Sequence, residues 1–287
     1  MTSPTRVVRG ARRRLVGAWQ AGLRRSVVML GTTPRVAYMH YWTLREGADS
    51  LVAFHNYFSL LDPHARGPCH ADLRVYDADG RTLATTGIDV PARGCAQVSV
   101  RSLLPAAVAA IQTEGSLELD VLPPGDFTHE RNVAGAFEVS AARFFMLYRS
   151  PAGMLATSHC IEKSQTYRGL PSPLAGLLTT RERRVPAWRC KRPIATRGLQ
   201  EVRVVVVNYA ESSGRLHVAL RMGAGGPVVA EARRTVPPRG LLTLEHRQGD
   251  EPAAEFYTLH SEGLPTPNGK PYLWVRYGDG PAAMHHA

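Results

Sequence analysis

Residues 71–103, ADLRVYDADGRTLATTGIDVPARGCAQVSVRSL, decide how the rest of the chain is interpreted. Short runs in which apolar and polar residues alternate indicate strands that bury one face. Between the first two runs, residues 77–80, DADG, tolerate the left-handed conformation of a tight hairpin turn. Residues 90–94, VPARG, end the second strand, because proline lacks a ladder donor and glycine suits a corner. The stretch therefore predicts a β-hairpin followed by a third strand.

The same pattern returns later in the chain. Residues 204–246, VVVVNYAESSGRLHVALRMGAGGPVVAEARRTVPPRGLLTLEH, again predict strands separated by a turn, a Gly-rich turn and a corner. The corner VPARG at 90–94 corresponds to VPPRG at 236–240, and the Asn-Tyr pair at 56–57 corresponds to that at 208–209. We expect each asparagine to be a buried amide that satisfies the backbone of its corner. A repeat of about a hundred residues predicts two tandem β-sandwich domains, with jelly-roll or immunoglobulin-like geometry.

Composition and turn signals divide the remaining chain. Proline, glycine and the run RERR mark residues 166–186 as a linker, and the Ala-rich residues 104–112 predict one short helix. The predicted organisation is a basic N-terminal arm at 1–35, a first sandwich at 36–165, the linker, and a second sandwich at 187–287.

The arm carries most of the charge of the chain. Of a formal net charge of +11, eight arginines and no acidic residue lie in the first 35 positions. Residues 6–30 have the apolar spacing of an amphipathic helix, which needs a surface to pack on. That surface is the sandwich itself, a protein partner or an anionic membrane, and nucleic acid is less favoured because no recognised motif accompanies the arginines. The residues expected to dock are Arg12, Arg13, Arg14, Trp19, Leu23, Arg24 and Arg25.

Targeting and cysteine signals are weak. The arm begins like a twin-arginine signal, but Gln20 and later arginines interrupt any apolar region, and no apolar run approaches 18 residues. We therefore expect a cytoplasmic protein that the arm can place at the periphery of a membrane. Four cysteines without C-x-x-C spacing are expected to be free buried thiols, and a bond between Cys69 and Cys95 remains the alternative for an exported protein.

Familiar enzyme motifs are missing from the sequence. It contains no G-x-S-x-G elbow, Walker A loop or G-x-G-x-x-G fingerprint, and the DADG turn lacks the downstream acidic ligand of a calcium loop. A non-enzymatic binding or scaffold protein is therefore predicted, whose partner is a protein, a glycan or a membrane surface. The candidate ligand-binding side chains, for which core packing is the alternative, are Trp42, Tyr57, Trp188 and Tyr209.

Histidines supply the competing hypothesis. If His40, His55 and His159 converge at one end of a sandwich, three imidazoles could hold a divalent metal with an open position, as in a hydrolase or oxygenase. The alternative is that each is an ordinary polar residue at a strand end. The loop expected at 62–70 adds His64, Cys69 and His70 without a zinc-binding spacing. No other cofactor is predicted.

Each repeat also resembles the small cytoplasmic β-sandwich of the sensory rhodopsin transducer proteins. The shared pattern is a strand ending in asparagine, as in VAFHNY and VVVVNY, then a hairpin, then a V-P-[AP]-R-G corner before the next strand. The resemblance implies a non-enzymatic homo-oligomer that binds proteins, DNA or small ligands. The duplication, the arm and the extra loop at 62–70 depart from the family, so a rhodopsin partner is not carried over.

Overall fold

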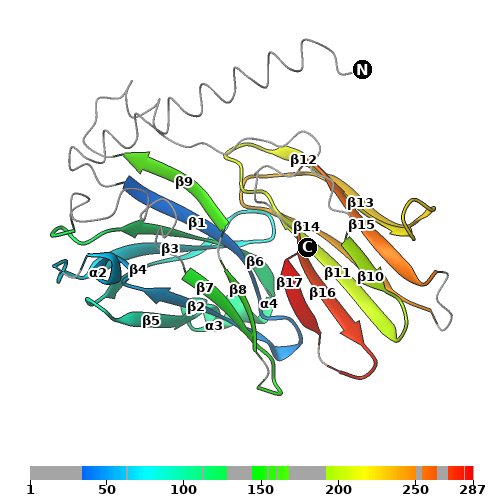
Figure 1. The fold of residues 1–287 in the computed structure, drawn as a ribbon, viewed down its shortest axis with the longest axis horizontal. Coiled ribbons are helices and arrows are strands. Elements are labelled where there is room, and N and C mark those ends of the chain that lie inside the picture. Colours follow the sequence, from blue (N-terminus) through cyan, green and yellow to red (C-terminus); the bar gives the residue numbers. More distant parts are fainter. Residues whose placement is uncertain are drawn as a thin grey trace, which may run out of the picture.

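The chain folds into antiparallel β-sheets (Figure 1). The computed structural model describes residues 34–62, 64–111, 113–127, 144–153, 155–159, 161–167, 192–249, 254–263, 271–280 and 282–286. Within them the strands form one five-stranded and three four-stranded sheets. The all-β prediction is confirmed. Most of the arm with its docking residues, most of the linker, Trp188, Cys160 and Cys190 lie outside the described residues.

The first half of the chain contributes sheets A and B. Its elements are β1 (Pro34–Thr43), η1 (Arg45–Gly47), β2 (Asp49–His55), α2 (Phe58–Leu61), β3 (Cys69–Asp77), β4 (Thr82–Val90), β5 (Cys95–Ser99), α3 (Val100–Leu103), α4 (Ala106–Ile111), β6 (Glu114–Leu122), β7 (Phe144–Arg149), β8 (Leu155–His159) and β9 (Ile161–Tyr167). Sheet A has the order β4-β3-β6-β1-β9, and sheet B has the order β5-β2-β7-β8.

The second half contributes sheets C and D. Its strands are β10 (Arg192–Ala195), β11 (Leu199–Val207), β12 (Gly214–Met222), β13 (Val228–Val236), β14 (Leu241–Arg247), β15 (Phe256–Glu262), β16 (Tyr272–Tyr277) and β17 (Ala283–His286). Sheet C has the order β10-β15-β12-β13, and sheet D has the order β14-β11-β16-β17. If β1 is matched with β10, β2 with β11 and so on to β8 and β17, both halves have the same strand order. Only β9 has no counterpart among the described strands.

Two hydrophobic clusters hold the four sheets together. One fills the space between sheets C and D with aliphatic side chains such as Val204, Val218 and Leu259. The other lies between sheets A and B and extends into the second half through Val205, Tyr272 and further residues of sheet D. Because β11 contributes to both clusters, it is buried on both faces, which explains its continuous run of valines.

The corner of the first half is held by the asparagine that follows β2. The backbone N–H of Asn56 donates to the carbonyl oxygen of Gly94 at 3.0 Å, and its Nδ2 donates to that of Val90 at 3.1 Å. Arg93 adopts a φ of 58°, in the left-handed region that permits the tight reversal. The side chain of Asn56 is buried, so this prediction for the first asparagine is confirmed.

The corner of the second half is built in the same way. The N–H of Asn208 donates to the carbonyl oxygen of Gly240 at 2.9 Å, and its Nδ2 donates to that of Val236 at 2.9 Å. Arg239 adopts a φ of 65°. The sequence signature Asn followed by V-P-x-R-G therefore specifies one local structure at two places in the chain.

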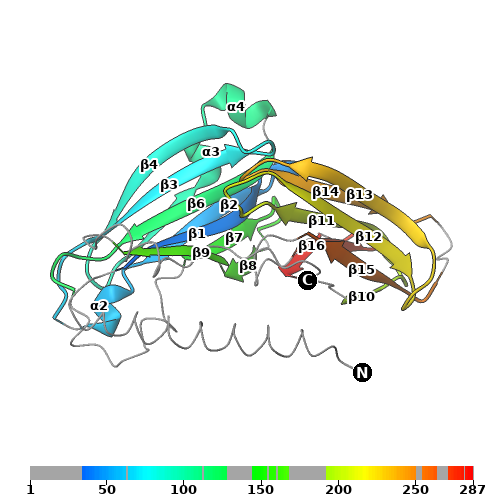
Figure 2. The same ribbon diagram turned by 90° about the horizontal axis from the view of Figure 1, so that it is seen from above.

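The second corner also joins the two halves. Figure 2 shows the β3–β4 hairpin of the first half meeting the β13–β14 corner of the second. The N–H of Leu241 donates to the carbonyl oxygen of Ala78 at 2.8 Å, and the hydroxyl of Ser116 donates to that of Arg239 at 2.6 Å. The Arg239 guanidinium reaches the buried carboxylate of Glu118, with Nε and Oε2 3.1 Å apart. These contacts and the shared core fix the two halves against each other.

Several local predictions need correction. Cys69 and His70 belong to β3 and not to a loop, and the strand β9, which was not predicted, pairs with β1. The third strand of the opening stretch ends at Ser99, whose hydroxyl accepts from the N–H of Ser102 and caps the helix α3. The predicted hairpin and the helix α4 are confirmed.

Candidate functional site

Trp42, proposed from the sequence to face a ligand, is fully buried in sheet A. Its Nε1 donates to the carbonyl oxygens of Tyr76 at 2.9 Å and Ser116 at 3.0 Å. Gly115 makes room for the indole, since a Cβ there would lie 2.9 Å from Nε1. Trp42 therefore joins three strands of the sheet. Its role is core packing, which was the alternative to ligand binding.

The remaining aromatic candidates do not form a common surface. Tyr209 is buried, and its hydroxyl lies 2.8 Å from that of Tyr272 in the core shared by the two halves. Tyr57 is partly buried and packs against the core of the first half. Trp188 lies outside the described residues. None of the three described candidates lines the pocket identified below.

His40 belongs to a buried hydrogen-bond cluster between sheets A and B. Its Nδ1 lies 2.9 Å from the carbonyl oxygen of Tyr41, so Nδ1 carries the proton and donates. Its Nε2 lies 3.0 Å from the hydroxyl of Ser158, which then donates to it. The Tyr148 hydroxyl donates to the same carbonyl at 2.7 Å, and burial raises the pKa of Tyr148 well above its ordinary value. Both ring nitrogens of His40 are thus engaged in buried hydrogen bonds, and the one to Ser158 joins sheets A and B.

The other two histidines of the proposed metal site are placed differently. His55 is exposed on the outer face of sheet B and contacts the ring of Phe145. His159 lies at the end of β8, opposite Phe145 in the register, and its side chain is outside the description. His40 therefore lies on the inner side of sheet B, between the two sheets, and His55 lies on its outer side. In the described part of the chain, no group of three His, Cys, Asp or Glu side chains is arranged to hold a metal.

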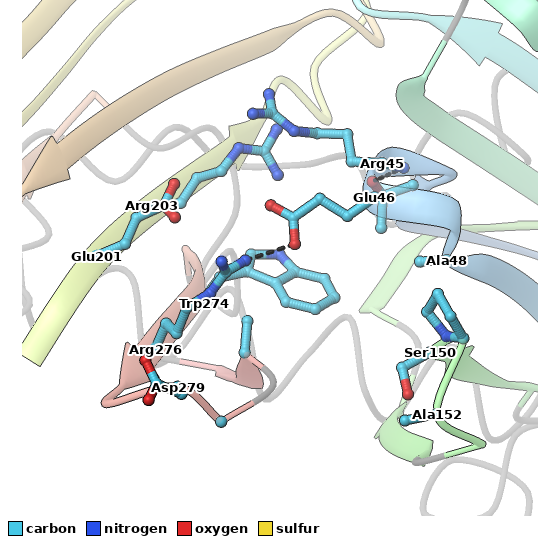
Figure 3. A pocket seen from close by; sticks show the side chains of 14 residues that line it. Arg45, Glu46, Ala48, Ser150, Ala152, Glu201, Arg203, Trp274, Arg276 and Asp279 are labelled. Carbon is cyan, nitrogen blue, oxygen red and sulfur yellow. Dashed lines mark hydrogen bonds and ion pairs between the residues drawn. The ribbon is translucent and has the colours of Figure 1, made fainter.

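A pocket of about 430 Å³ lies where the two halves meet, and we call it the junction pocket (Figure 3). The first half lines it with the end of β1, the β1–β2 turn and the β7–β8 turn at residues 150–152. The second half lines it with β11, β16 and the turn that leads to β17. Neither half alone encloses this space.

The pocket lies where one face of sheet D changes from apolar to polar along its strands. Strand residues two apart share a face, so Val205 and Val207 of β11 and Tyr272 of β16 pack together on the core of the first half. Further along the same face, Arg203 and Trp274 are cross-strand partners, and the surface becomes polar. The pocket begins where this polar part of sheet D diverges from the turns of the first half.

A partly buried charge network lies at one end of the pocket. Arg203 donates from Nε to Glu245 at 2.9 Å, donates from Nη1 to the Tyr41 hydroxyl at 2.8 Å, and forms an ion pair with Glu114. Arg45 reaches the same Glu245 carboxylate at 2.8 Å. Two arginines and two glutamates thus neutralise one another, which offsets the cost of burying the Arg203 charge.

The mouth of the pocket is crossed by an ion pair between the halves. Glu46, in the β1–β2 turn, reaches across to Nη2 of Arg276 on β16 (Figure 3). Glu46 has a φ of 52°, which is unfavourable for a residue with a Cβ. The next residue, Gly47, has a φ of 75° and packs so closely that a Cβ would lie 3.1 Å from Cγ of Pro151. The turn therefore holds Glu46 over the pocket in a strained conformation.

The floor carries two hydrogen-bond donors that are not used. Trp274 packs edge-to-face on Tyr148, with ring centroids 5.3 Å apart. Its indole Nε1 is buried, as is Nε of Arg276, and neither atom has an acceptor among the described residues. Buried donors without acceptors are uncommon and costly, so these two make the floor a candidate position for an acceptor.

The described lining determines which groups the pocket presents. The described lining holds arginine, acidic, small and aromatic side chains but no histidine or cysteine. Ser150 lies in the wall, and no imidazole lines the pocket to activate its hydroxyl as a nucleophile. What the pocket offers a ligand is hydrogen bonds, charge and an indole surface.

Comparisons with protein-family models, with curated proteins and with solved structures find no match. The resemblance to the sensory rhodopsin transducer sandwich therefore stays a prediction from the residues. No helix in the described residues is both long and apolar enough to cross a bilayer.

The residues of the junction pocket were not predicted from the sequence. One signal was available: Arg203 interrupts a run of valines in β11, and a charged residue in a strand buried on both faces needs a buried partner. The pairing of Glu46 with Arg276 had no such signal, because the two residues are 230 positions apart.

Proposed function

We propose that this chain is a non-enzymatic binding protein that takes up a small ligand in the junction pocket. The observation that carries the proposal is a pocket lined by both halves whose floor has two unused donors, Trp274 Nε1 and Arg276 Nε. Its volume of about 430 Å³ suits a small molecule. The many ordered contacts between the halves favour a site that is largely formed before the ligand arrives.

We further propose that the two halves are copies of one eight-stranded sandwich. The matching strand orders and the matching hydrogen bonds of Asn56 and Asn208 support this origin. On this view the binding site arose at the junction between the copies, because the equivalent positions of each copy face different surroundings. The resemblance to a family of non-enzymatic sandwiches is consistent with a binding role, and the basic arm would then dock the protein on a partner or an anionic membrane.

The binding proposal is tested by thermal unfolding of the full chain in the presence of amino acids, dicarboxylates, monosaccharides and polyamines, each added separately. A ligand that binds only the folded protein stabilises it by about 2.7 kcal/mol when present at a hundred times its dissociation constant. We therefore expect one class of compound to raise the unfolding midpoint by several degrees.

Two variants locate the effect. Ala152 is exposed at the tip of the β7–β8 turn and lines the pocket, so Ala152→Trp should fill the pocket and abolish the shift. Ala110 is exposed on α4 and does not line the pocket, so Ala110→Trp should retain it. If no compound class shifts the midpoint, or if both variants respond as the wild type does, the proposed function is wrong.

A further inference from the structure

If the proposed binding function holds, the groups that line the junction pocket indicate the chemistry of its ligand. Trp274 and Arg276 lie two residues apart on β16 and therefore project from the same face of the strand. Each has a buried N–H that finds no acceptor in the described chain. A buried unsatisfied donor costs about 1–3 kcal/mol, so an oxygen acceptor at this position would relieve two such costs at once.

A carboxylate already lies beside these donors. Glu46 extends from the first half toward Arg276, and Figure 3 shows its side chain in the mouth of the pocket next to Trp274. It engages Nη2 of Arg276 and leaves Nε unused. Its side chain is 64% exposed and its backbone has a φ of 52°. Strain of this kind costs about 1–3 kcal/mol and is released if the turn relaxes. Glu46 is thus a poorly bound carboxylate that another carboxylate can replace.

The guanidinium geometry favours that replacement. The Nε and one Nη of an arginine form a fork that matches the two oxygens of a carboxylate, and such bidentate pairs are stronger than single contacts. An incoming carboxylate would accept from both nitrogens of Arg276, whereas Glu46 accepts from one. The indole N–H of Trp274 would supply a third donor on the same floor.

The charge of the surroundings limits what else the ligand carries. Arg45 and Arg203 are already neutralised by Glu114 and Glu245, which leaves Arg276 as the available cation. Three carboxylates line the pocket together with this cation, those of Glu46, Glu201 and Asp279. A ligand with two or more negative charges would be repelled, whereas a cationic group next to the carboxylate would be attracted.

We infer that the junction pocket binds a small zwitterion with a carboxylate and an ammonium group, as in an α-amino acid. The carboxylate displaces Glu46 from Arg276 and accepts from the indole of Trp274. The ammonium group lies among the carboxylates that remain. Apolar lining at Ala48 and Pro151 accommodates an uncharged side chain.

The test follows the indole N–H resonance of Trp274 by nitrogen–proton correlation spectroscopy of the full chain. The chain has four tryptophans, and Trp274→Phe identifies the signal by its loss. The probes are L-phenylalanine, L-phenylalaninamide, which lacks the carboxylate, and 3-phenylpropionate, which lacks the ammonium group. We expect L-phenylalanine to shift the resonance in a saturable way and each of the other two to bind at least tenfold more weakly.

A matched variant tests the role of the arginine. Arg276→Lys keeps the positive charge and removes the Nε donor, so L-phenylalanine should bind at least tenfold more weakly while the unfolding midpoint changes little. Unchanged affinity in this variant overturns the assignment of the carboxylate to Arg276. If L-phenylalaninamide binds as tightly as L-phenylalanine, the pocket does not require a carboxylate and the inference is wrong. If 3-phenylpropionate binds as tightly as L-phenylalanine, the pocket does not require an ammonium group and the inference is again wrong.

The outcomes separate this inference from the proposed function. If L-phenylalanine leaves the resonance unchanged while another compound class raises the unfolding midpoint of the wild type, the zwitterion inference is wrong and the binding function stands. If neither the resonance nor the midpoint responds to any compound, both are wrong.

Discussion

Gly80 of the β3–β4 hairpin packs directly on the backbone of Pro238 in the second corner, so that a Cβ on Gly80 would stand 2.1 Å from the carbonyl oxygen of Pro238. Nearby, the guanidinium of Arg239 lies 5.4 Å from the centroid of the Tyr76 ring. The two halves therefore meet through their backbones as well as through side chains. Such a contact leaves little room for adjustment at the place where the two halves meet.

We predict that Gly80→Ala destabilises the protein by about 2–5 kcal/mol. The φ of 78° costs an alanine roughly 1–2 kcal/mol, and the clash with a carbonyl oxygen adds about 1–3 kcal/mol because backbone must move. The measurement is urea unfolding at equilibrium, followed by fluorescence.

Gly198 supplies a control for the backbone term. It has a φ of 73° and no atom within 4 Å of an added Cβ, so Gly198→Ala should cost only about 1–2 kcal/mol. If the two variants lose equal stability, the close approach of Gly80 to Pro238 adds nothing to the cost of the positive φ.

The two corner asparagines should have similar effects when removed. Asn208→Ala leaves the buried carbonyl oxygen of Val236 without its donor, and Asn56→Ala does the same to Val90. We expect each variant to lose about 1–3 kcal/mol of unfolding free energy. Gln97→Ala deletes an exposed amide from β5 and should change stability by less than about 0.5 kcal/mol. Equal losses in all three variants would contradict the structural role of the asparagines.

The parts of the fold that could be predicted from the sequence are those set by local chemistry. Alternating apolar residues, the DADG turn and the V-P-x-R-G corners act over a few residues, and each was placed correctly. Strand β9 was missed, because its partner β1 lies far earlier in the chain and is chosen by tertiary pairing. Cys69 and His70 were assigned to the preceding loop, although they extend the predicted hairpin by pairing with Val90 and Asp89. The burial of Trp42 was left open for the same reason: its two acceptors lie on other strands.

The candidate site could not be predicted, because residues of both halves line it. The residues that the two halves share in sequence, such as the Asn-Tyr pairs, instead pack in or against the core. Glu46 and Arg276 come from non-equivalent turns and strands and meet only when the halves dock. A pocket between the two halves is specified by their relative placement, about which local periodicity says nothing.

The two described cysteines should differ sharply in reactivity. Burial raises the pKa of the Cys69 thiol to about 12, whereas Cys95 is exposed on β5. The thiolate is the reactive form, so iodoacetamide should label Cys95 in the native protein and reach Cys69 only after unfolding. Peptide mapping by mass spectrometry reads both positions. Rapid native labelling of Cys69, or a disulfide between the two residues, would contradict the structure.

His70 lies between two carboxylates on the surface of sheet A. Its Nδ1 is 2.7 Å from Asp89 and its Nε2 is 3.1 Å from Asp72. Both nitrogens can donate only when the ring is charged. The hydrogen bond to Asp89, aided by Asp72, raises the pKa of His70 above its ordinary value, and partial burial opposes this change.

Because the pKa of His70 is higher in the folded state than in the unfolded state, protonation stabilises the fold. The contribution is fully present below about pH 6.5, the unfolded value, and is lost as the pH rises through the folded value. The His70 side chain is 40% exposed and that of Asp89 is 75% exposed, so solvent limits the effect to a few tenths of a kcal/mol, or about 1 at most. Urea unfolding of the wild type and of His70→Gln should therefore differ more at pH 5.5 than at pH 8.5, and 1 M salt should reduce the difference. His64→Gln, at an exposed position of the preceding loop, is the control and should show no such trend. A difference between wild type and His70→Gln that grows with pH would show that the two carboxylates do not bind a charged imidazole.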